Sequence, residues 1–173
     1  MFKKFLPNMY SENIFTINYK KLKKEKIKCL LVEVDNTITP AREEEFFEEV
    51  KELFDGLKMD FKIILFSNNF QKRIVKFGNY YDVDIEFLAL KPLPFKYKKI
   101  IRKYGFKKTE IACIGDQLIT DIQGGNKSGF KTILIEPISE KDEKETWFNR
   151  KLEKMIFNSF EKNKLLIKGK YYD

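Results

Sequence analysis

Short apolar runs alternate with amphipathic segments through the middle of this chain, and this alternation constrains the fold more than any other feature. Five runs are as short and continuous as strands buried on both faces of a sheet, at 29–34, 62–67, 85–90, 111–115 and 131–136. Apolar residues recur at helical spacing in 43–57, 95–104 and 145–160, and we also expect helices over 70–79 and in a short segment that ends at Gly129. This order predicts an α/β fold with a doubly wound, mostly parallel, Rossmann-like sheet covered by helices on both faces.

The chain is long enough for one domain and has enough apolar residues to build its core. A length of 173 residues favours a single domain over 1–173. Apolar residues make up 43% of the sequence, so the fold needs no disulfide or structural metal. The segment 1–28 has weak periodicity, and whether it is ordered stays open.

The chain has no histidine and two cysteines, which narrows the chemistry available to it. Without His there is no His-based triad, His general base or His metal ligand, so carboxylates remain the main catalytic option. Cys29 and Cys113 lie within apolar runs and are expected to be buried and reduced. The apolar runs are shorter than the roughly 18 residues of a membrane span. The N-terminus is not typical of a signal peptide, so we expect a cytoplasmic protein.

Charged and polar side chains follow the first four predicted strands of the middle section. In chain order they are Glu33, Asp35, Ser67, Asn68, Lys91, Asp116 and Asp121. Ligands of such sheets bind beyond the carboxyl ends of the strands. We therefore expect these side chains to share one pocket.

A carboxylate cluster with one lysine suits a hard cation and a phosphate. Mg²⁺ prefers oxygen ligands and usually takes one or two protein carboxylates together with waters and substrate oxygens. Glu33 and Asp35 can both serve the cation, one through its side chain and the other through its backbone carbonyl. Lys91 would neutralise phosphate charge, and Ser67 with nearby backbone N–H groups would hold phosphate oxygens. Taken singly these residues have ordinary interpretations, since an Asp-Asn-Thr stretch is more often a turn or a helix cap.

Together the residues resemble the four motifs of haloacid dehalogenase (HAD) phosphatases. Glu33-Val34-Asp35-Asn36-Thr37 resembles the first motif, Asp-x-Asp-x-Thr, while Ser67 and Lys91 match the second and third. Gly115-Asp116, with Asp121 beyond it, matches the fourth. Longer stretches are similar to the YqeG family of class IIIA HAD phosphatases, namely 5–8, 67–69, 115–126 and 149–153.

The resemblance implies a HAD-like fold and Mg²⁺-dependent hydrolysis of a phosphomonoester. It implies that Glu33 attacks phosphorus, and that Asp35 protonates the leaving group and then activates water. It implies phosphate contacts from Ser67, Asn68 and Lys91, and metal ligands among Asp116, Glu33 and Asp35. Asp121 would be either a further metal ligand or a partner that supports the ligands. Relatives of the YqeG type include enzymes that act on phosphatidylglycerophosphate, so a phospholipid headgroup is the implied substrate.

Glu33 departs from the family pattern, which has Asp at this position. The extra methylene moves the carboxylate by roughly 1 Å or slightly more, and misplacement on that scale can cost on the order of a hundredfold in rate. The sequence leaves open a slow enzyme, an enzyme retuned for Glu, and a phosphate-binding protein without turnover.

The spacing of the motifs leaves no room for a cap domain over the site. Between Thr37 and Ser67 lie 29 residues, and between Ser67 and Lys91 lie 23. One helix and one strand fill each interval. An uncapped site is open to solvent and admits a bulky substrate, including a headgroup presented by a membrane.

The net charge of +8 resides in the two ends of the chain. Residues 1–28 contain eight Lys and two acids, residues 140–173 contain nine basic residues and seven acids, and residues 29–139 balance at seventeen of each. These basic flanks suit an anionic membrane surface and a location peripheral to the membrane. A binding protein that contacts RNA or a ribosomal particle is the alternative, and a surface that only maintains solubility is a third interpretation.

Overall fold

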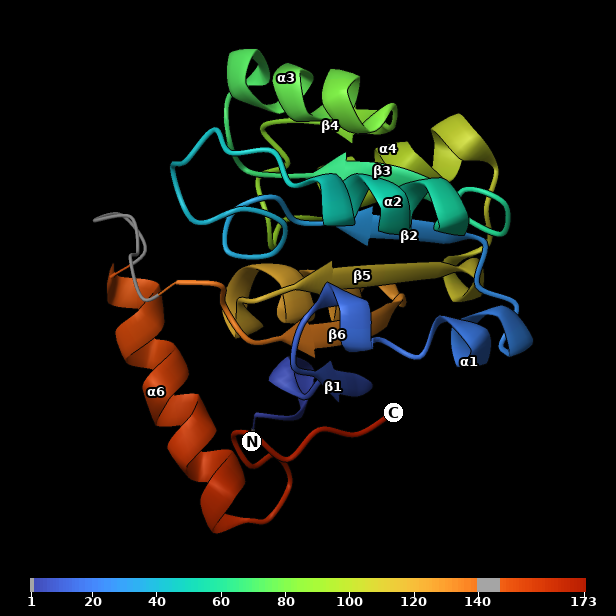
Figure 1. Cartoon of the computed structure of the whole chain (residues 1–173). Coiled ribbons are helices and arrows are strands. Elements are labelled where there is room, and N and C mark those ends of the chain that lie inside the picture. Colours follow the sequence, from blue (N-terminus) through green and yellow to red (C-terminus); the bar gives the residue numbers. More distant parts are fainter. Residues whose placement is uncertain (1, 140–146) are drawn as a thin grey trace.

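The computed structural model describes residues 2–139 and 147–173, and its framework is a sheet of six parallel strands. The strands are β1 (Met9–Ser11), β2 (Cys29–Val32), β3 (Lys62–Phe66), β4 (Asp84–Glu86), β5 (Ile111–Gly115) and β6 (Lys131–Ile135). Their order across the sheet is β1-β6-β5-β2-β3-β4, and each neighbouring pair is parallel (Figure 1). The chain winds outward from the central β2 in both directions, which confirms the predicted doubly wound sheet.

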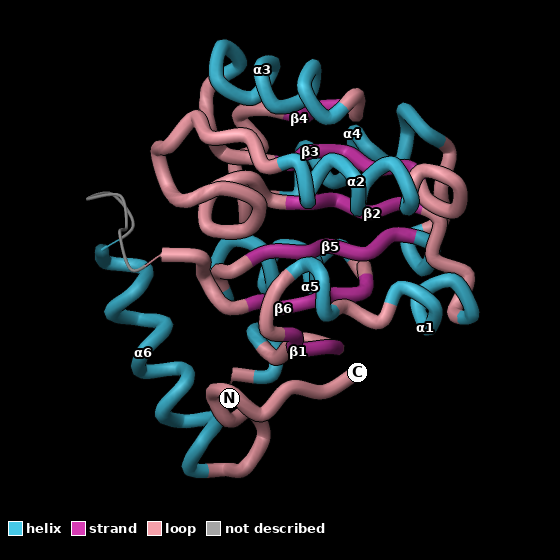
Figure 2. Tube along the Cα trace, viewed as in Figure 1, coloured by secondary structure: helices cyan, strands magenta, loops and turns pink. Residues whose placement is uncertain are grey.

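Helices cover both faces of the sheet (Figure 2). They are α1 (Tyr19–Lys24), α2 (Glu48–Leu57), α3 (Gln71–Tyr81), α4 (Pro94–Tyr104), α5 (Gln123–Ser128) and α6 (Trp147–Lys162). Leu30 and Val32 of β2 belong to the core cluster shared with α2 and α3, whereas Cys29 and Leu31 belong to the cluster shared with α4. Strand residues thus alternate between two apolar layers, as a sheet covered on both faces requires. In the described part of the chain, every helix falls short of the length and apolarity needed to cross a bilayer.

Two predicted elements are shorter than the sequence pattern suggested. The helix expected from residue 43 begins at Glu48, because Phe47 is extended and its N–H donates to the Tyr81 hydroxyl at 3.1 Å. The strand expected over 85–90 ends at Glu86, because Leu88 and Leu90 adopt left-handed backbone conformations with φ of 46° and 53°. The first two residues of the helix expected over 145–160 lie outside the described residues.

The N-terminal segment contributes an edge strand that the sequence pattern did not reveal. β1 pairs with β6, with Tyr10 opposite Leu134. Asn126 of α5 donates its amide to the carbonyls of Lys4 and Leu6 at 2.9 and 3.0 Å. Asn8 adds a bond from the Thr132 N–H to its side-chain oxygen at 2.8 Å. These bonds give the stretches 5–8 and 124–126 a shared structural role, which is to join the N-terminus to the sheet.

Both cysteines are free and buried, as the sequence predicted. Burial raises the pKa of the Cys29 and Cys113 thiols to about 12. Thiols in that state are poor nucleophiles, so the chemistry of the molecule must come from other side chains.

Candidate active site

The polar residues predicted to share a pocket follow four adjacent strands, β5, β2, β3 and β4, at one edge of the sheet. Val32 pairs with Leu65 of β3 and with Ile114 of β5. Glu33 is therefore one residue beyond this row of paired residues, and Ser67 and Asp116 are each two residues beyond it. Burial leaves Glu33, Ser67 and Asp116 no more than 9% exposed, so the edge is a packed polar site and not a surface loop.

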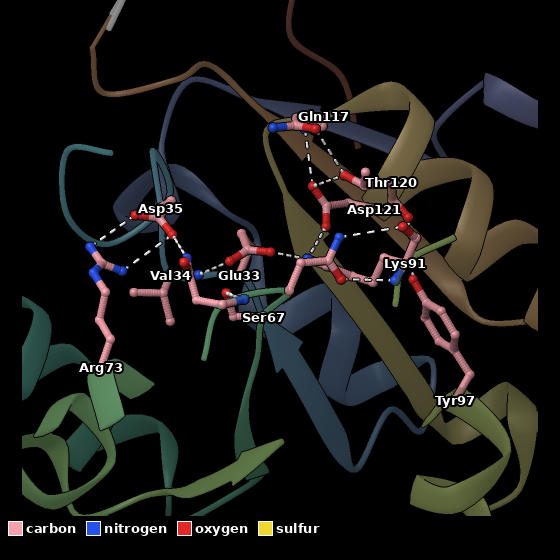
Figure 3. A network of polar contacts seen from close by, with 12 residues as sticks. Glu33, Val34, Asp35, Ser67, Arg73, Lys91, Tyr97, Gln117, Thr120 and Asp121 are labelled. Atoms are coloured by element: carbon pink, nitrogen blue, oxygen red, sulfur yellow. Dashed lines mark hydrogen bonds and ion pairs between the residues drawn. The ribbon is translucent and has the colours of Figure 1, made fainter. Parts of the chain in front are cut away.

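Lys91 is the charge centre of this site (Figure 3). Its ammonium contacts the Glu33 Oε2 and lies 2.6 Å from the Asp121 Oδ1. The side chains of Lys91 and Asp121 are almost completely buried, and that of Glu33 is 10% exposed. Two carboxylates and one ammonium leave this buried cluster with one negative charge, which is unfavourable without a further cation.

Loop hydrogen bonds fix the backbone of Lys91. The Asn68 side chain accepts from the Lys91 N–H at 2.8 Å and donates to the Lys91 carbonyl at 3.3 Å. The neighbouring Asn69 N–H donates to the Ser67 hydroxyl at 3.3 Å. Asn68, which the resemblance placed on the phosphate, uses both ends of its amide on Lys91. It is therefore a positioning residue in this arrangement.

Gly115 explains why the site tolerates Asp121 so deep in the protein. A Cβ at position 115 would lie 2.3 Å from the Asp121 carboxyl carbon, so only glycine leaves room for this carboxylate. The Asp121 Oδ2 also accepts from the Gln117 N–H at 3.1 Å and from the Thr120 hydroxyl at 3.3 Å. These bonds hold Asp121 against Lys91, which favours its role as the partner of that lysine.

Asp35 is held away from the Lys91 cluster. Arg73 of α3 contacts both of its oxygens, with distances of 2.9 Å from Nη2 to Oδ1 and 3.2 Å from Nη1 to Oδ2. The Asn69 amide also donates to the Asp35 Oδ2, and the Arg42 N–H donates to Oδ1 at 3.1 Å. In Figure 3 the Asp35 carboxylate turns toward Arg73, whereas the Glu33 carboxylate turns toward Lys91.

Arg73 is the site residue that the sequence analysis missed. It also donates to the Glu43 carbonyl at 2.7 Å, which ties the loop after β2 to the start of α3. In the sequence it is one of several basic residues on an amphipathic helix, and its spacing gives no sign that it faces Asp35. Only the packing of α3 over the β2 loop brings the two together.

Asp116 faces a cavity on the opposite side of the site from Arg73. The cavity has a volume of about 470 Å³ and is lined by residues that follow β6 and by α6, including Glu136, Glu153 and Phe157. Glu153 anchors α6 there by accepting from the Ile119 N–H at 3.0 Å. This bond gives the 149–153 stretch of the sequence a structural role close to the site.

The oxygen donors of the site suit Mg²⁺ by their chemistry. Among the described residues, no three carboxylates or thiols gather as a ready metal site. Mg²⁺ does not require three, since it is usually held by one or two carboxylates with waters and phosphate oxygens. Glu33 and Asp116 follow neighbouring strands, and the buried cluster around Lys91 has excess negative charge. The residues present therefore fit the ion.

Comparisons with known proteins agree with this geometry. A family model described as haloacid dehalogenase-like hydrolase matches residues 2–129. The probable phosphatase YqeG of Bacillus subtilis (strain 168) is 36% identical over 171 residues, covering 94% of this chain and 95% of that protein. Phosphatidylglycerophosphate phosphatase 1, chloroplastic/mitochondrial, of Arabidopsis thaliana is 25% identical over 148 residues, covering 80% of this chain and 42% of that protein.

A solved structure shares the fold at low sequence identity. The cobalt-bound deoxy-D-mannose-octulosonate 8-phosphate phosphatase YrbI of Haemophilus influenzae aligns with a TM-score of 0.50 and 17% identity. The alignment covers 79% of this chain and 91% of that chain, so the likeness extends over most of the sheet and its helices.

Proposed function

This chain belongs to the haloacid dehalogenase-like hydrolases and is a phosphatase, and from that premise we propose that it hydrolyses a phosphomonoester with Glu33 as nucleophile and Mg²⁺ as cofactor. The main support is the buried contact of Lys91 with both Glu33 and Asp121. An ammonium in that position neutralises charge beside the reacting carboxylate and offers donors to a phosphate oxygen.

In the proposed reaction a Glu33 oxygen attacks phosphorus, and the bond from phosphorus to the leaving oxygen breaks. Asp35 gives its proton to that oxygen. Water then attacks the phosphorus held on Glu33, passes a proton to Asp35, and releases inorganic phosphate while the Glu33 carboxylate is restored. Asp35 reaches the leaving group only after it separates from Arg73, so we interpret the observed Asp35–Arg73 pair as a resting arrangement.

Phosphate binding in this proposal involves Ser67 and Lys91. The Ser67 hydroxyl and the Lys91 ammonium are hydrogen-bond donors at the ends of neighbouring segments, and Asn68 fixes the backbone of Lys91. A phosphate dianion would add two negative charges to a cluster that already has one in excess. This excess of negative charge supports a divalent cation as part of the site.

Mg²⁺ would be held by the side chains of Glu33 and Asp116 with the backbone carbonyl of Asp35, and Asp121 would remain the partner of Lys91. When bound, the ion supplies positive charge that stabilises the transferring phosphoryl group. Mg²⁺ should raise the melting temperature of the wild type in a thermal-shift assay, and Asp116→Asn should reduce that shift. Equal shifts for the two proteins would exclude Asp116 as a ligand.

A phosphorylated lipid headgroup, such as that of phosphatidylglycerophosphate, is the proposed substrate class. It is supported by the name of the Arabidopsis thaliana relative and by the absence of any inserted domain in the described intervals between Thr37, Ser67 and Lys91. A protein of this kind would act at the cytoplasmic surface of a membrane.

The decisive experiment measures phosphate release from soluble phosphomonoesters and phosphorylated lipids, with Mg²⁺ or with a chelator. We expect Mg²⁺-dependent release by the wild type and none by Glu33→Gln, because an amide is a poor nucleophile. The surface variant Lys51→Met is the control and should behave as the wild type.

A binding role without turnover is the second candidate, and the Glu33 contacts favour it. The Glu33 Oε1 accepts from the Val34 N–H at 2.7 Å while Oε2 contacts Lys91, so both oxygens already have partners. Such a protein would hold an anionic partner, either RNA, a ribosomal particle or an anionic membrane. Inactivity of both the wild type and Glu33→Asp over the whole panel would support this candidate.

A further inference from the structure

Five exposed apolar side chains belong to the segments that contain Ser67 and Lys91. They are Phe70, Leu88, Leu90, Leu93 and Phe95, between 38% and 75% exposed, and we call them the apolar rim. The described residues contain eleven large exposed hydrophobic side chains, and nearly half of them lie on the two loops that follow β3 and β4 or, in the case of Phe95, in the first turn of α4. Single exposed apolar residues scattered over a surface are ordinary, whereas these five are concentrated in two neighbouring segments.

Hydrogen bonds hold the two loops of the rim together. The Leu88 N–H donates to the Asn69 carbonyl at 3.0 Å, and the Ala89 N–H donates to the Ser67 carbonyl at 2.9 Å. Ala89 itself is completely buried between the two exposed leucines. The exposure of the rim is therefore part of the folded structure and does not result from fraying.

Four rim residues occupy positions where local folding favours small polar residues. Leu88 and Leu90 have φ of 46° and 53°, a region that bulky side chains rarely enter and that Gly or Asn enters more easily. Phe70 and Leu93 are the N-cap residues of α3 and α4, and neither makes a capping hydrogen bond. Serine or asparagine would stabilise such caps. The sequence thus keeps apolar groups at this surface against local stability, which indicates a function.

The surroundings of the rim are basic. The segment 67–81 has three basic residues and no acid, and the segment 87–104 has six basic residues and no acid. The intervening residues 82–86 contain three acids. Asp82 at the end of α3 and Asp84 at the start of β4 lie at the amino end of that strand, away from the rim. Glu86 is buried and bound by Lys96 and by Lys99, the latter at 2.8 Å. Burial opposes ionisation of Glu86, yet the lysine hydrogen bonds outweigh it and hold its pKa below the ordinary value. Apart from the buried Lys91, the charges that these two segments contribute are exposed or partly exposed and positive, and Glu44 pairs with Lys76 on α3.

We propose that the apolar rim and its lysines are the surface on which this protein docks to an anionic lipid bilayer. Apolar side chains flanked by lysines suit the boundary between headgroups and acyl chains, where the apolar groups insert and the lysines meet lipid phosphates. Because the rim borders Ser67 and Lys91, docking would bring the phosphate site to the headgroup layer. The inference rests on the proposed function in that it assigns the substrate phosphate to a lipid.

The basic N-terminal flank is less suited to this task because of where it lies. The lysines of α1 precede β2, so they sit at the amino end of the sheet, opposite the carboxyl edge that contains the site (Figure 1). A membrane bound to α1 would face away from Glu33 and Lys91. The rim, in contrast, shares its loops with Ser67 and Lys91.

Co-sedimentation with phosphatidylcholine vesicles, with and without phosphatidylglycerol, tests the docking surface. We expect the wild type to prefer the anionic vesicles, with binding weakened by salt. The variant Phe70→Ser with Leu93→Ser should lose about tenfold or more of this affinity, while its melting temperature stays the same or rises because serine caps both helices. Leu88→Asn with Leu90→Asn should behave in the same way, since asparagine tolerates the left-handed backbone.

The matched control is Met59→Asn, which removes an apolar side chain that is 86% exposed at a loop remote from the rim. It should bind vesicles as the wild type does. Unchanged binding by both rim variants, equal binding to neutral and anionic vesicles, or a preference for an RNA oligonucleotide over anionic vesicles would overturn the proposal.

Turnover of a soluble phosphomonoester separates this proposal from the proposed function. Rim variants should retain that turnover, whereas Glu33→Gln should lose it and still bind vesicles. A wild type that binds anionic vesicles through the rim but hydrolyses nothing would leave the docking surface established and the proposed function refuted.

Discussion

Removal of the Lys91 ammonium should destabilise this protein more than most single substitutions. The Lys91 side chain is 1% exposed and lies between the carboxylates of Glu33 and Asp121. Lys91→Met keeps much of the side-chain volume but leaves two buried carboxylates near each other without a cation. Removing one partner of a buried ion pair typically costs about 3–5 kcal/mol. For a domain of this size that corresponds to a fall in melting temperature of about 6–20 °C.

Urea and thermal unfolding followed by far-ultraviolet circular dichroism would measure this change. The control is Lys51→Met, because Lys51 is 39% exposed and lies 3.9 Å from Glu48 on the surface of α2. Its loss should change the free energy of unfolding by no more than about 0.5 kcal/mol. Both proteins should unfold with the same denaturant dependence if the folded state is preserved.

A double variant tests whether charge is the cause. Lys91→Met with Asp121→Asn removes one carboxylate as well as the ammonium, so it should be more stable than Lys91→Met alone, with a coupling free energy above about 1 kcal/mol. A loss of less than about 1 kcal/mol for Lys91→Met would show that Lys91 is not the buried charge centre we describe. An absence of coupling to Asp121 would show that the loss comes from packing.

Three further predictions follow from the site and its surroundings. Glu33→Asp should raise kcat on a soluble phosphomonoester about tenfold if carboxylate reach limits attack, and a slower variant would mean that the pocket is built around the longer side chain. Gly115→Ala should lower both melting temperature and turnover, because its Cβ would lie 2.3 Å from the Asp121 carboxyl carbon, whereas Gly56→Ala meets nothing within 4 Å and should lower neither. The pKa of Glu86 is held below its ordinary value, so its stabilising effect is complete above about pH 4.3 and is lost as the pH falls through the folded-state pKa. The difference in melting temperature between the wild type and Glu86→Gln should therefore shrink on acidification from neutral pH, and a constant difference would contradict the assigned ion pairs.

Spacing patterns in the sequence were enough to predict the fold class and to place the candidate site residues at one edge of the sheet. Apolar runs short enough for strands and continuous enough for burial on both faces correspond to β2, β3, β5 and β6. Helix ends were predictable where glycine adopts a left-handed conformation, as at Gly105 and Gly129 with φ of 73° and 78°. These features are local, since they depend only on spacing and on the backbone freedom of single residues.

The sequence also predicted that the candidate site residues gather at one edge, because each follows a strand whose carboxyl end meets that edge. The contact of the Asp35 carboxylate with Arg73 was not predicted. Nor was the contact of the Asn68 amide with the Lys91 backbone. Both contacts join segments that are 23 or more residues apart in the chain.

The contacts between segments that are distant in the sequence could be seen only in the tertiary structure. β1 is only three residues long, and its place in the sheet depends on pairing with β6, more than a hundred residues away. The apolar rim combines residues of the loop after β3 with residues of the loop after β4 and the start of α4, and these segments become neighbours because β3 and β4 pair. Local patterns determine which elements form. Long-range packing determines which side chains face each other, because the crossovers between parallel strands bring distant segments of the chain to one edge.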